Sequence, residues 1–173
     1  MEHVLDVKKL VNELTLEEKA SLCSGADFWH TEAIDRLNIP AAMVSDGPHG
    51  IRKQENLADH MGVAESIKAI GFPTASAMAC SFDRDLLHKV GDALGEECVA
   101  EDLAVLLGPG INMKRSPICG RNFEYYSEDP VVAGELGAAF VNGVQEHGVG
   151  TSLKHFAANN QEWSRHHASS DID

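Results

Sequence analysis

Short apolar runs alternate with helical segments along this chain, and this alternation constrains its possible folds more than any other feature. Four runs have the length and apolar character of buried strands: residues 41–44, 75–80, 103–107 and 150–156. Helical patterns, with apolar residues three or four positions apart, lie between the later runs. Because strands separated by helices pair in parallel through crossover connections, the sequence predicts an α/β fold. Residues 1–173 contain no internal repeat or linker and are expected to form one unit.

Capping residues predict where the helices begin. Thr15 and Glu18 have the spacing of a capping box, and Asp129 followed by Pro130 is a typical helix start. The helices predicted in this way begin at Thr15, Asp83 and Pro130, with a further short helix near Ala64 to Ile70.

The longest segment without helical or alternating periodicity runs from Leu106 to Pro130 and follows a predicted strand. Charged and aromatic residues are concentrated in it: Lys114, Arg115, Arg121, Phe123, Glu124, Tyr125, Tyr126, Glu128 and Asp129. A long irregular loop between a strand and a helix is uncommon in a compact domain unless the loop is functional. We therefore expect this loop to form the chemical centre of the protein.

Charge and hydropathy exclude several classes of partner. The formal charge of −13 argues against nucleic acid and anionic membranes, since both are bound through excess Lys and Arg. No apolar run reaches the ~18 residues of a membrane span, and the first residues do not resemble a signal peptide. The four cysteines form no closely spaced pair, which predicts reduced thiols in a cytoplasmic protein and no metal site.

Charged residues follow the predicted strands. Asp46 and Arg52 follow the first strand, Arg115 and Arg121 follow the third, and Lys154, His155 and Arg165 lie at and after the fourth. An α/β barrel and a doubly wound sheet both place ligands at the carboxyl ends of parallel strands. The pattern alone does not separate these folds, but both predict a site in these loops.

Five segments, in this order, carry a more specific pattern: LTLEEKASLCSGADFWHTEAIDRLNIP, SDGPHGIR, GFPTASAMACSFD, GPGINMKRSPICGRNFEYYSEDP and GVGTSLKHFAANNQE. Together they resemble the N-terminal half of glycoside hydrolase family 3, in its β-glucosidase branch. The resemblance covers residues 14–173. It implies an α/β fold that is the N-terminal part of a TIM-type (β/α)8 barrel, with about four to five of the eight βα units, since a complete barrel needs about 250 residues.

The resemblance implies retaining hydrolysis of terminal, non-reducing β-D-glucosyl residues in β-glucosides or short β-linked gluco-oligosaccharides. This chemistry uses two carboxyl groups and no cofactor. In the family, the nucleophile lies in a Ser-Asp-Trp type motif beyond the Lys-His pair, and a later domain or loop supplies the acid/base. Neither is present in this chain. Residues 1–173 are therefore expected to be an inactive partial barrel, whose partner is the rest of its own polypeptide, including a second α/β domain.

The family's sugar-binding residues match a set of polar residues in this chain: Asp46, Arg52, Arg121, Lys154, His155 and Arg165. A carboxylate accepts hydrogen bonds from neighbouring sugar hydroxyls, while Arg, Lys and His donate to hydroxyl oxygens. Glu124 and Arg115 are expected to support the site, and Trp29 is either a pocket wall or a core residue. Without the resemblance, the Ser-Asp-Gly-Pro sequence favours Asp46 as a turn residue. Arg115 and Arg121 could likewise pair with Glu124, Glu128 and Asp129 in their own loop.

Lys154 and His155 are adjacent, and adjacent side chains on a regular strand point to opposite faces. Both can contact one sugar only if the backbone departs from strand geometry. An irregular backbone is therefore predicted near His155 and Phe156.

Two alternatives to a β-glucosidase remain open at this point. One is a catalytically inactive carbohydrate-binding or vestigial fragment. The other is a β-xylosidase or N-acetylglucosaminidase of the same family, because residues that recognise the outer substituents of the sugar lie partly outside this chain.

Overall fold

The computed structural model describes residues 6–54 and 65–172. Its helices are α1 (Val7–Glu13), α2 (Leu16–Ser24), α3 (Ala75–Ala79), α4 (Arg84–Ala100) and α5 (Pro130–Gln145), with short 3-10 turns η1 (Asp35–Leu37) and η2 (Asn122–Glu124). Its strands are β1 (Val44–Asp46), β2 (Val105–Leu107) and β3 (Gly150–Thr151).

The three strands form one parallel sheet in the order β1-β2-β3. Asp46 at the end of β1 lies beside Leu107 at the end of β2, and Leu106 lies beside Thr151 of β3. Helix α4 connects β1 to β2, and α5 connects β2 to β3, because parallel neighbours need a long crossover. The predicted α/β class with parallel strands is confirmed.

The predicted capping residues begin the helices as expected. The Thr15 hydroxyl accepts a hydrogen bond from the Glu18 N–H at 3.2 Å, and the Glu18 carboxylate accepts one from the Thr15 N–H at 2.8 Å. Asp83 and Asp129 accept hydrogen bonds from free N–H groups in the first turns of α4 and α5. Short-range capping chemistry therefore determines where these three helices start.

Residues 75–80, predicted as a strand, instead form helix α3. The Thr74 side chain caps it by accepting a hydrogen bond from the Ala77 N–H. The segment contains Ala, Ser and Met but no β-branched residue, so its local preference is helical. Ala75 and Met78 are three positions apart and both are buried, as a helix face requires. The described part of the chain consequently has three parallel strands rather than the predicted four.

Three other boundaries differ from the sequence prediction. Residues 65–70 are not helical, and Ser66 forms an isolated antiparallel bridge with Gln54 instead; Ala64 lies outside the described residues. The first strand is shifted towards Asp46, because Met43 pairs with His30 outside the sheet. The last strand ends at Thr151, since the chain then turns into the pocket described below.

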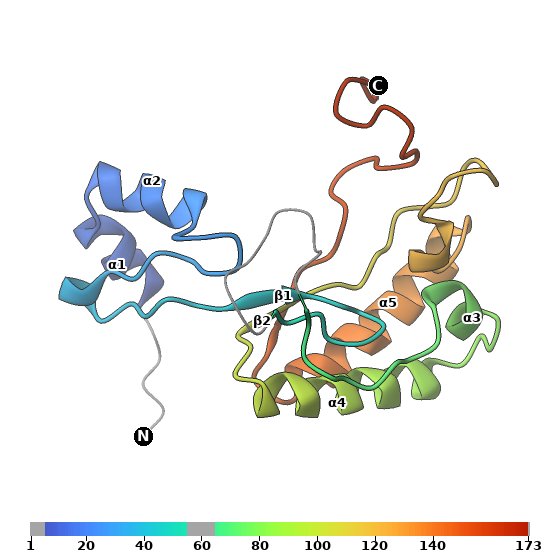
Figure 1. Ribbon diagram of the computed structural model, residues 1–173, viewed down its shortest axis with the longest axis horizontal. Coiled ribbons are helices and arrows are strands. Elements are labelled where there is room, and N and C mark those ends of the chain that lie inside the picture. The colour runs from blue at the N-terminus through green and yellow to red at the C-terminus, as the bar shows by residue number, and fades with distance from the viewer. Residues whose placement is uncertain (1–5, 55–64, 173) are drawn as a thin grey trace.

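Helices α4 and α5 lie side by side and pack against the sheet (Figure 1). Leu94 of α4, Leu106 of β2 and Phe140 of α5 are fully buried in the shared core. Glycines allow the two helices to approach closely: a Cβ on Gly143 would lie 2.2 Å from the His88 carbonyl oxygen. This packing holds the sheet rigidly, so the loops at its carboxyl edge start from fixed points.

Helices α1 and α2 lie apart from the sheet (Figure 1). Arg36 holds them to the following connector, because it forms an ion pair with Glu18 and donates to the Glu13 carbonyl. Over residues 6–54 and 65–172, no helix combines the length and the apolar character needed to cross a membrane.

The close approach of α4 and α5 is testable by adding one methyl group. We expect Gly143→Ala to destabilise the fold by ~2 kcal/mol or more, because the new Cβ meets backbone atoms that cannot move independently. Gly134→Ala is the matched control in the same helix, where a Cβ meets nothing within 4 Å and helix propensity favours Ala. Thermal unfolding should show a lower midpoint for the first variant only; equal midpoints would contradict the packing argument.

Candidate active-site pocket

A pocket of about 1040 Å³ opens at the carboxyl ends of the three strands. Asp46 ends β1, Leu107 ends β2 and Ser152 follows β3, and all three line it. Eight of the nine predicted site residues line the same pocket: Trp29, Asp46, Arg52, Arg121, Glu124, Lys154, His155 and Arg165. The strand ends and the long loop after β2 therefore converge on one site.

Glu124 lies at the centre of the pocket's charged groups. Its side chain is only 8% exposed, and it receives Lys154 Nζ on Oε1 and Arg121 on Oε2, each at 2.7 Å. Burial opposes ionisation of this carboxyl, but hydrogen bonds from Arg121 and Lys154 outweigh it and lower the pKa of Glu124 to about 2. Glu124 is thus an anion at neutral pH and holds two cations in position.

Lys154 connects Glu124 to the end of β1. Its Nζ also lies 2.8 Å from Asp46 Oδ1, and its side chain is 12% exposed. The backbone of Lys154 is fixed as well, because its N–H donates to the Pro109 carbonyl and its carbonyl accepts from the Ile111 N–H. The first turn of the long loop therefore sets the position of Lys154.

The predicted backbone irregularity after Lys154 is confirmed. Regular strand geometry ends at Thr151, before Lys154 and His155 are reached. The side chains of Lys154 and His155 both face the charged cluster: His155 Nε2 lies 2.9 Å from an Arg121 nitrogen. The two adjacent residues therefore line one pocket, as the sequence argument required.

His155 is surrounded by donors and aromatic groups. Its Nδ1 lies 2.6 Å from the Tyr125 hydroxyl, and its backbone N–H donates to Asn112 Oδ1 at 2.7 Å. Burial, followed by the positive charges of Arg121 and Lys154, lowers the pKa of His155 below its ordinary value. The imidazole is accordingly neutral at pH 7.

Arg165 is linked to Arg121 through Glu162, a residue that the sequence did not predict to be in the site. Glu162 accepts from Arg165 at 3.0 Å and lies 3.6 Å from Arg121, so it joins the two arginines. Glu162 ends the GVGTSLKHFAANNQE segment. Nothing in a single sequence distinguishes this glutamate from the acidic residues that are exposed to solvent.

Two further pocket residues were also missed. The rings of His49 and Phe123 lie 6.3 Å apart on the pocket wall. Burial lowers the pKa of His49, which favours its neutral form. Phe123 belongs to the long loop and His49 to the SDGPHGIR segment, but no local pattern shows that their rings reach the pocket, since the folding of their loops decides it.

Trp29 and Arg52 line the side of the pocket nearest β1. Trp29 Nε1 donates to Gln54 Oε1 at 3.0 Å, which fixes the indole as part of the wall. The Arg52 N–H donates to the Asp46 carbonyl, so this hydrogen bond joins the two ends of the turn after β1. Trp29 was expected to be either a pocket wall or a core residue, and in the structure it lines the pocket.

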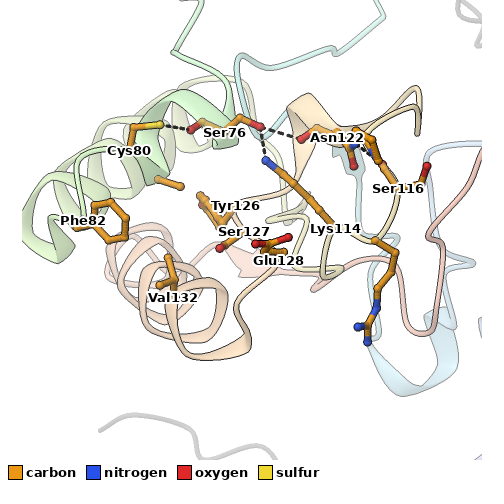
Figure 2. A pocket seen from close by; sticks show the side chains of 13 residues that line it. Ser76, Cys80, Phe82, Lys114, Ser116, Asn122, Tyr126, Ser127, Glu128 and Val132 are labelled. Atoms are coloured by element: carbon orange, nitrogen blue, oxygen red, sulfur yellow. Dashed lines mark hydrogen bonds between the residues drawn. The ribbon is translucent and has the colours of Figure 1, made fainter.

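Arg115 is the predicted residue that does not line this pocket. It lines a separate cavity of about 540 Å³ between α3, α5 and the long loop (Figure 2). There Lys114 points towards Ser76 and donates to its hydroxyl at 2.6 Å, and Ser76 donates in turn to the Asn122 carbonyl (Figure 2). These contacts join α3 to η2, whose last residue is Glu124.

The pocket combines acceptors and donors in alternation around an open volume. Asp46 and Glu162 present carboxylate oxygens, while Lys154 and the arginines present N–H groups. Hydroxyl groups both donate and accept, so several neighbouring hydroxyls match this arrangement. Within the described ranges, no group of three or more His, Cys, Asp or Glu residues is arranged to hold a metal ion. The pocket therefore suits a ligand with several neighbouring hydroxyl groups, bound at the carboxyl edge of a parallel sheet.

The comparison with known families agrees with this class of site. Residues 14–172 match the glycosyl hydrolase family 3 N terminal domain. The chain belongs to this family.

Similar proteins cover nearly all of this chain. Thermostable beta-glucosidase B of Acetivibrio thermocellus is 58% identical over 161 residues, which are 93% of this chain and 21% of that protein. An exo-alpha-(1->6)-L-arabinopyranosidase of Bifidobacterium longum is 53% identical over 90% of this chain and 21% of its own length. A β-glucosidase from Kluyveromyces marxianus, solved in complex with glucose, has a TM-score of 0.82 and 44% identity over 91% of this chain and 18% of its own. The chain spans about a fifth of the length of these curated relatives.

The low pKa of Glu124 makes a prediction about stability. The folded carboxyl has a pKa of about 2 against an ordinary value of 4.5, so its contribution is fully present above pH 4.5 and disappears as the pH falls towards 2. That contribution is on the order of 3 kcal/mol. At pH 7 the midpoint of thermal unfolding should be lower for Glu124→Gln than for the wild type. At pH 2 the two midpoints should converge.

The control for this measurement is Glu128→Gln, an exposed residue in the same loop. We expect its unfolding midpoints to follow the wild type at every pH. A Glu124→Gln curve that also runs parallel to the wild type from pH 7 to pH 2 would contradict the assigned role of Glu124.

Proposed function

We propose that the protein containing this segment is a retaining β-glucosidase, and that the segment holds the terminal, non-reducing β-D-glucosyl residue of its substrate. The observation that carries this proposal is the cluster of Asp46, Lys154, Glu124 and Arg121 at the strand ends. Relatives at 58% and 47% identity are a β-glucosidase and a probable β-glucosidase. The substrates we propose are β-glucosides and short β-linked gluco-oligosaccharides.

Each charged group has a defined part in holding the sugar. Asp46 accepts hydrogen bonds from neighbouring hydroxyls, and Lys154 and Arg121 donate to the hydroxyl oxygens. Glu124 is poorly placed to bind the sugar, because its side chain is only 8% exposed and both of its oxygens already accept from Lys154 or Arg121. Glu124 therefore supports the cations, and Arg52 and Arg165 extend the set of donors along the wall.

The pocket's own carboxylates do not fit the reacting roles. Retaining hydrolysis needs a nucleophile and a general acid about 5–5.5 Å apart, and the acid must hold a proton near neutral pH. The pKa of Glu124 is far too low for an acid, and Asp46 and Glu162 are engaged in holding Lys154 and Arg165. The family's nucleophile lies in a Ser-Asp-Trp type motif, which residues 1–173 do not contain. We therefore assign both reacting carboxylates to the rest of the polypeptide.

The rest of the polypeptide is also the partner that completes the fold. We propose that the three parallel strands are part of a TIM-type (β/α)8 barrel, and that a second α/β domain covers the pocket. The likeness to a solved β-glucosidase at a TM-score of 0.82 supports this assignment. A cytoplasmic location is supported by four cysteines that are all free thiols.

A second candidate substrate class is an α-L-arabinopyranoside. Two relatives at 53% identity are exo-α-(1→6)-L-arabinopyranosidases, so the same pocket frame occurs in proteins with that specificity. L-Arabinopyranose lacks the sixth carbon of glucose and has the opposite configuration at C4, so the two substrates differ at the outer positions of the ring. Comparing kcat/KM for aryl β-glucoside and aryl α-L-arabinopyranoside in the full-length protein decides between them.

The role of Asp46 is tested by one substitution in the full-length protein. Asp46→Asn should lower kcat/KM for an aryl β-glucoside by about 10- to 100-fold, because hydrogen bonds to a charged acceptor contribute ~1.5–3 kcal/mol. Asp92→Asn is the control, since Asp92 of α4 pairs with His147 just after α5 and does not line the pocket. Equal kinetics for the two variants would remove Asp46 from the sugar site.

The assignment of the reacting carboxylates is tested with the isolated segment. Residues 1–173 alone should release no nitrophenol from a nitrophenyl β-glucoside, whereas the full-length protein should hydrolyse this substrate. Hydrolysis by the isolated segment would contradict the assignment. A full-length protein that binds glucose without any hydrolysis would instead support an inactive carbohydrate-binding protein.

A further inference from the structure

We propose that His49 is a further substrate-binding residue of the pocket: helix α3 holds its Nε2, and its Nδ1–H donates a hydrogen bond to a hydroxyl oxygen of the bound sugar. The inference rests on the proposed function. It adds one neutral donor, on the turn after β1, to the charged groups of the pocket.

The first observation concerns Nε2 of His49, which accepts a hydrogen bond from the Ala75 N–H at 2.9 Å. Ala75 is the first residue of α3 and is 2% exposed, so its N–H is one of the free donors at a helix start and needs a partner. A backbone N–H can only donate, so Nε2 has to be the unprotonated nitrogen. The neutral imidazole therefore carries its proton on Nδ1.

A second contact holds His49 beside α3. Its carbonyl accepts a hydrogen bond from the Phe72 N–H at 3.0 Å, so both the backbone and the side chain of His49 are bonded to residues 72–75. His49 follows Asp46 by three residues. These contacts therefore join the strand end that carries Asp46 to the start of α3, and they fix the orientation of the imidazole.

The other ring nitrogen, Nδ1, is left for the ligand. The two nitrogens of an imidazole point away from each other, so Nδ1 faces away from α3. Among residues 6–54 and 65–172, Nδ1 has no hydrogen-bond partner, and the ring lines the open pocket. The Phe123 ring beside it, with centroids 6.3 Å apart, offers no lone pair. The Nδ1–H is thus a donor that is free for a ligand in the pocket.

The surroundings of His49 favour the neutral ring. Burial is the main cause that lowers the pKa of His49, and Lys154 lowers it further, while Glu124 and Asp46 act in the opposite direction. These three charged residues also line the pocket, so His49 borders the same ligand as they do. Protonation of Nε2 would remove the lone pair that accepts from Ala75.

A free neutral donor differs from the cations of the pocket in the cost of its use. Lys154 is already paired with Asp46 and Glu124, and Arg121 with Glu124. A sugar oxygen that binds these cations competes with carboxylates for their N–H groups. The Nδ1–H of His49 has no carboxylate partner, so a hydroxyl oxygen accepts from it without weakening an ion pair.

Two substitutions in the full-length protein separate the roles of the two nitrogens. Glutamine reaches as far as Nε2, so its Oε1 accepts from Ala75, but it has no donor at the place of Nδ1. Asparagine is shorter, so its Nδ2 replaces Nδ1 and nothing accepts from Ala75. We expect His49→Gln to lower kcat/KM for a nitrophenyl β-glucoside about 3- to 10-fold at an unchanged unfolding midpoint. His49→Asn should lower the midpoint, because the buried Ala75 N–H loses its acceptor.

Monodeoxy derivatives of the same substrate identify the hydroxyl that contacts His49. For each derivative, the loss of kcat/KM relative to the parent glucoside is compared between the wild type and His49→Gln. At one position the loss should be about 3- to 10-fold larger in the wild type, since only the wild type loses a hydrogen bond there. A purely structural role of His49 would leave the losses equal at every position.

His88→Gln is the matched control, because His88 pairs with Glu146 and does not line the pocket. We expect wild-type kinetics and wild-type losses with every deoxy substrate. If His49→Gln does not fold, His49→Asn decides instead: it keeps the donor, so its deoxy losses should match those of the wild type, and a mismatch would overturn the proposal.

The outcomes separate this inference from the proposed function. Wild-type kcat/KM in His49→Gln, or equal deoxy losses at every position, would overturn the contact between His49 and the sugar. An unchanged midpoint in His49→Asn would overturn the contact with α3, which is measured without substrate. A wild-type protein that neither hydrolyses the glucoside nor binds glucose would instead refute the proposed function.

Discussion

The buried carboxylate of Glu124 is the interaction on which the pocket depends. An isolated charge at 8% exposure would be strongly unfavourable, so the fold has to bring cations to it. Arg121 comes from the same loop, three residues earlier, and Lys154 comes from beyond β3. One anion therefore joins the long loop to the last strand, and it orients the two cations that face the pocket.

The scaffold makes this arrangement possible by fixing where the loops begin. Helices α4 and α5 pack closely through glycines and hold three parallel strands in register. The strand ends place Asp46 opposite Lys154, although 108 residues separate them in the sequence. Helix α3 adds a second support, since Ser76 accepts from Lys114 and donates to the turn that ends at Glu124. Rigid elements thus position residues that are themselves on irregular backbone.

Charge in the pocket is organised in layers around this centre. Glu124 satisfies the inner cations, while Glu162 joins Arg121 and Arg165 at the rim. His155 lies between these acids and the buried hydroxyl of Tyr125, and its neutral ring avoids a further positive charge beside Arg121. The imidazole therefore accepts from Arg121 and adds no positive charge to the pocket.

The sequence by itself determined the α/β class, three helix starts and the loops that form the pocket, because capping, periodicity and strand–helix alternation are local properties. It also predicted the broken strand after Lys154, since adjacent side chains cannot otherwise share a pocket. It failed at residues 75–80, where small residues suit a helix as well as a strand. Only the tertiary structure decided that Arg115 lies outside the pocket, that Glu162 lines it and that the buried Tyr125 contacts His155. Such contacts join residues distant in the chain, and no local pattern encodes them.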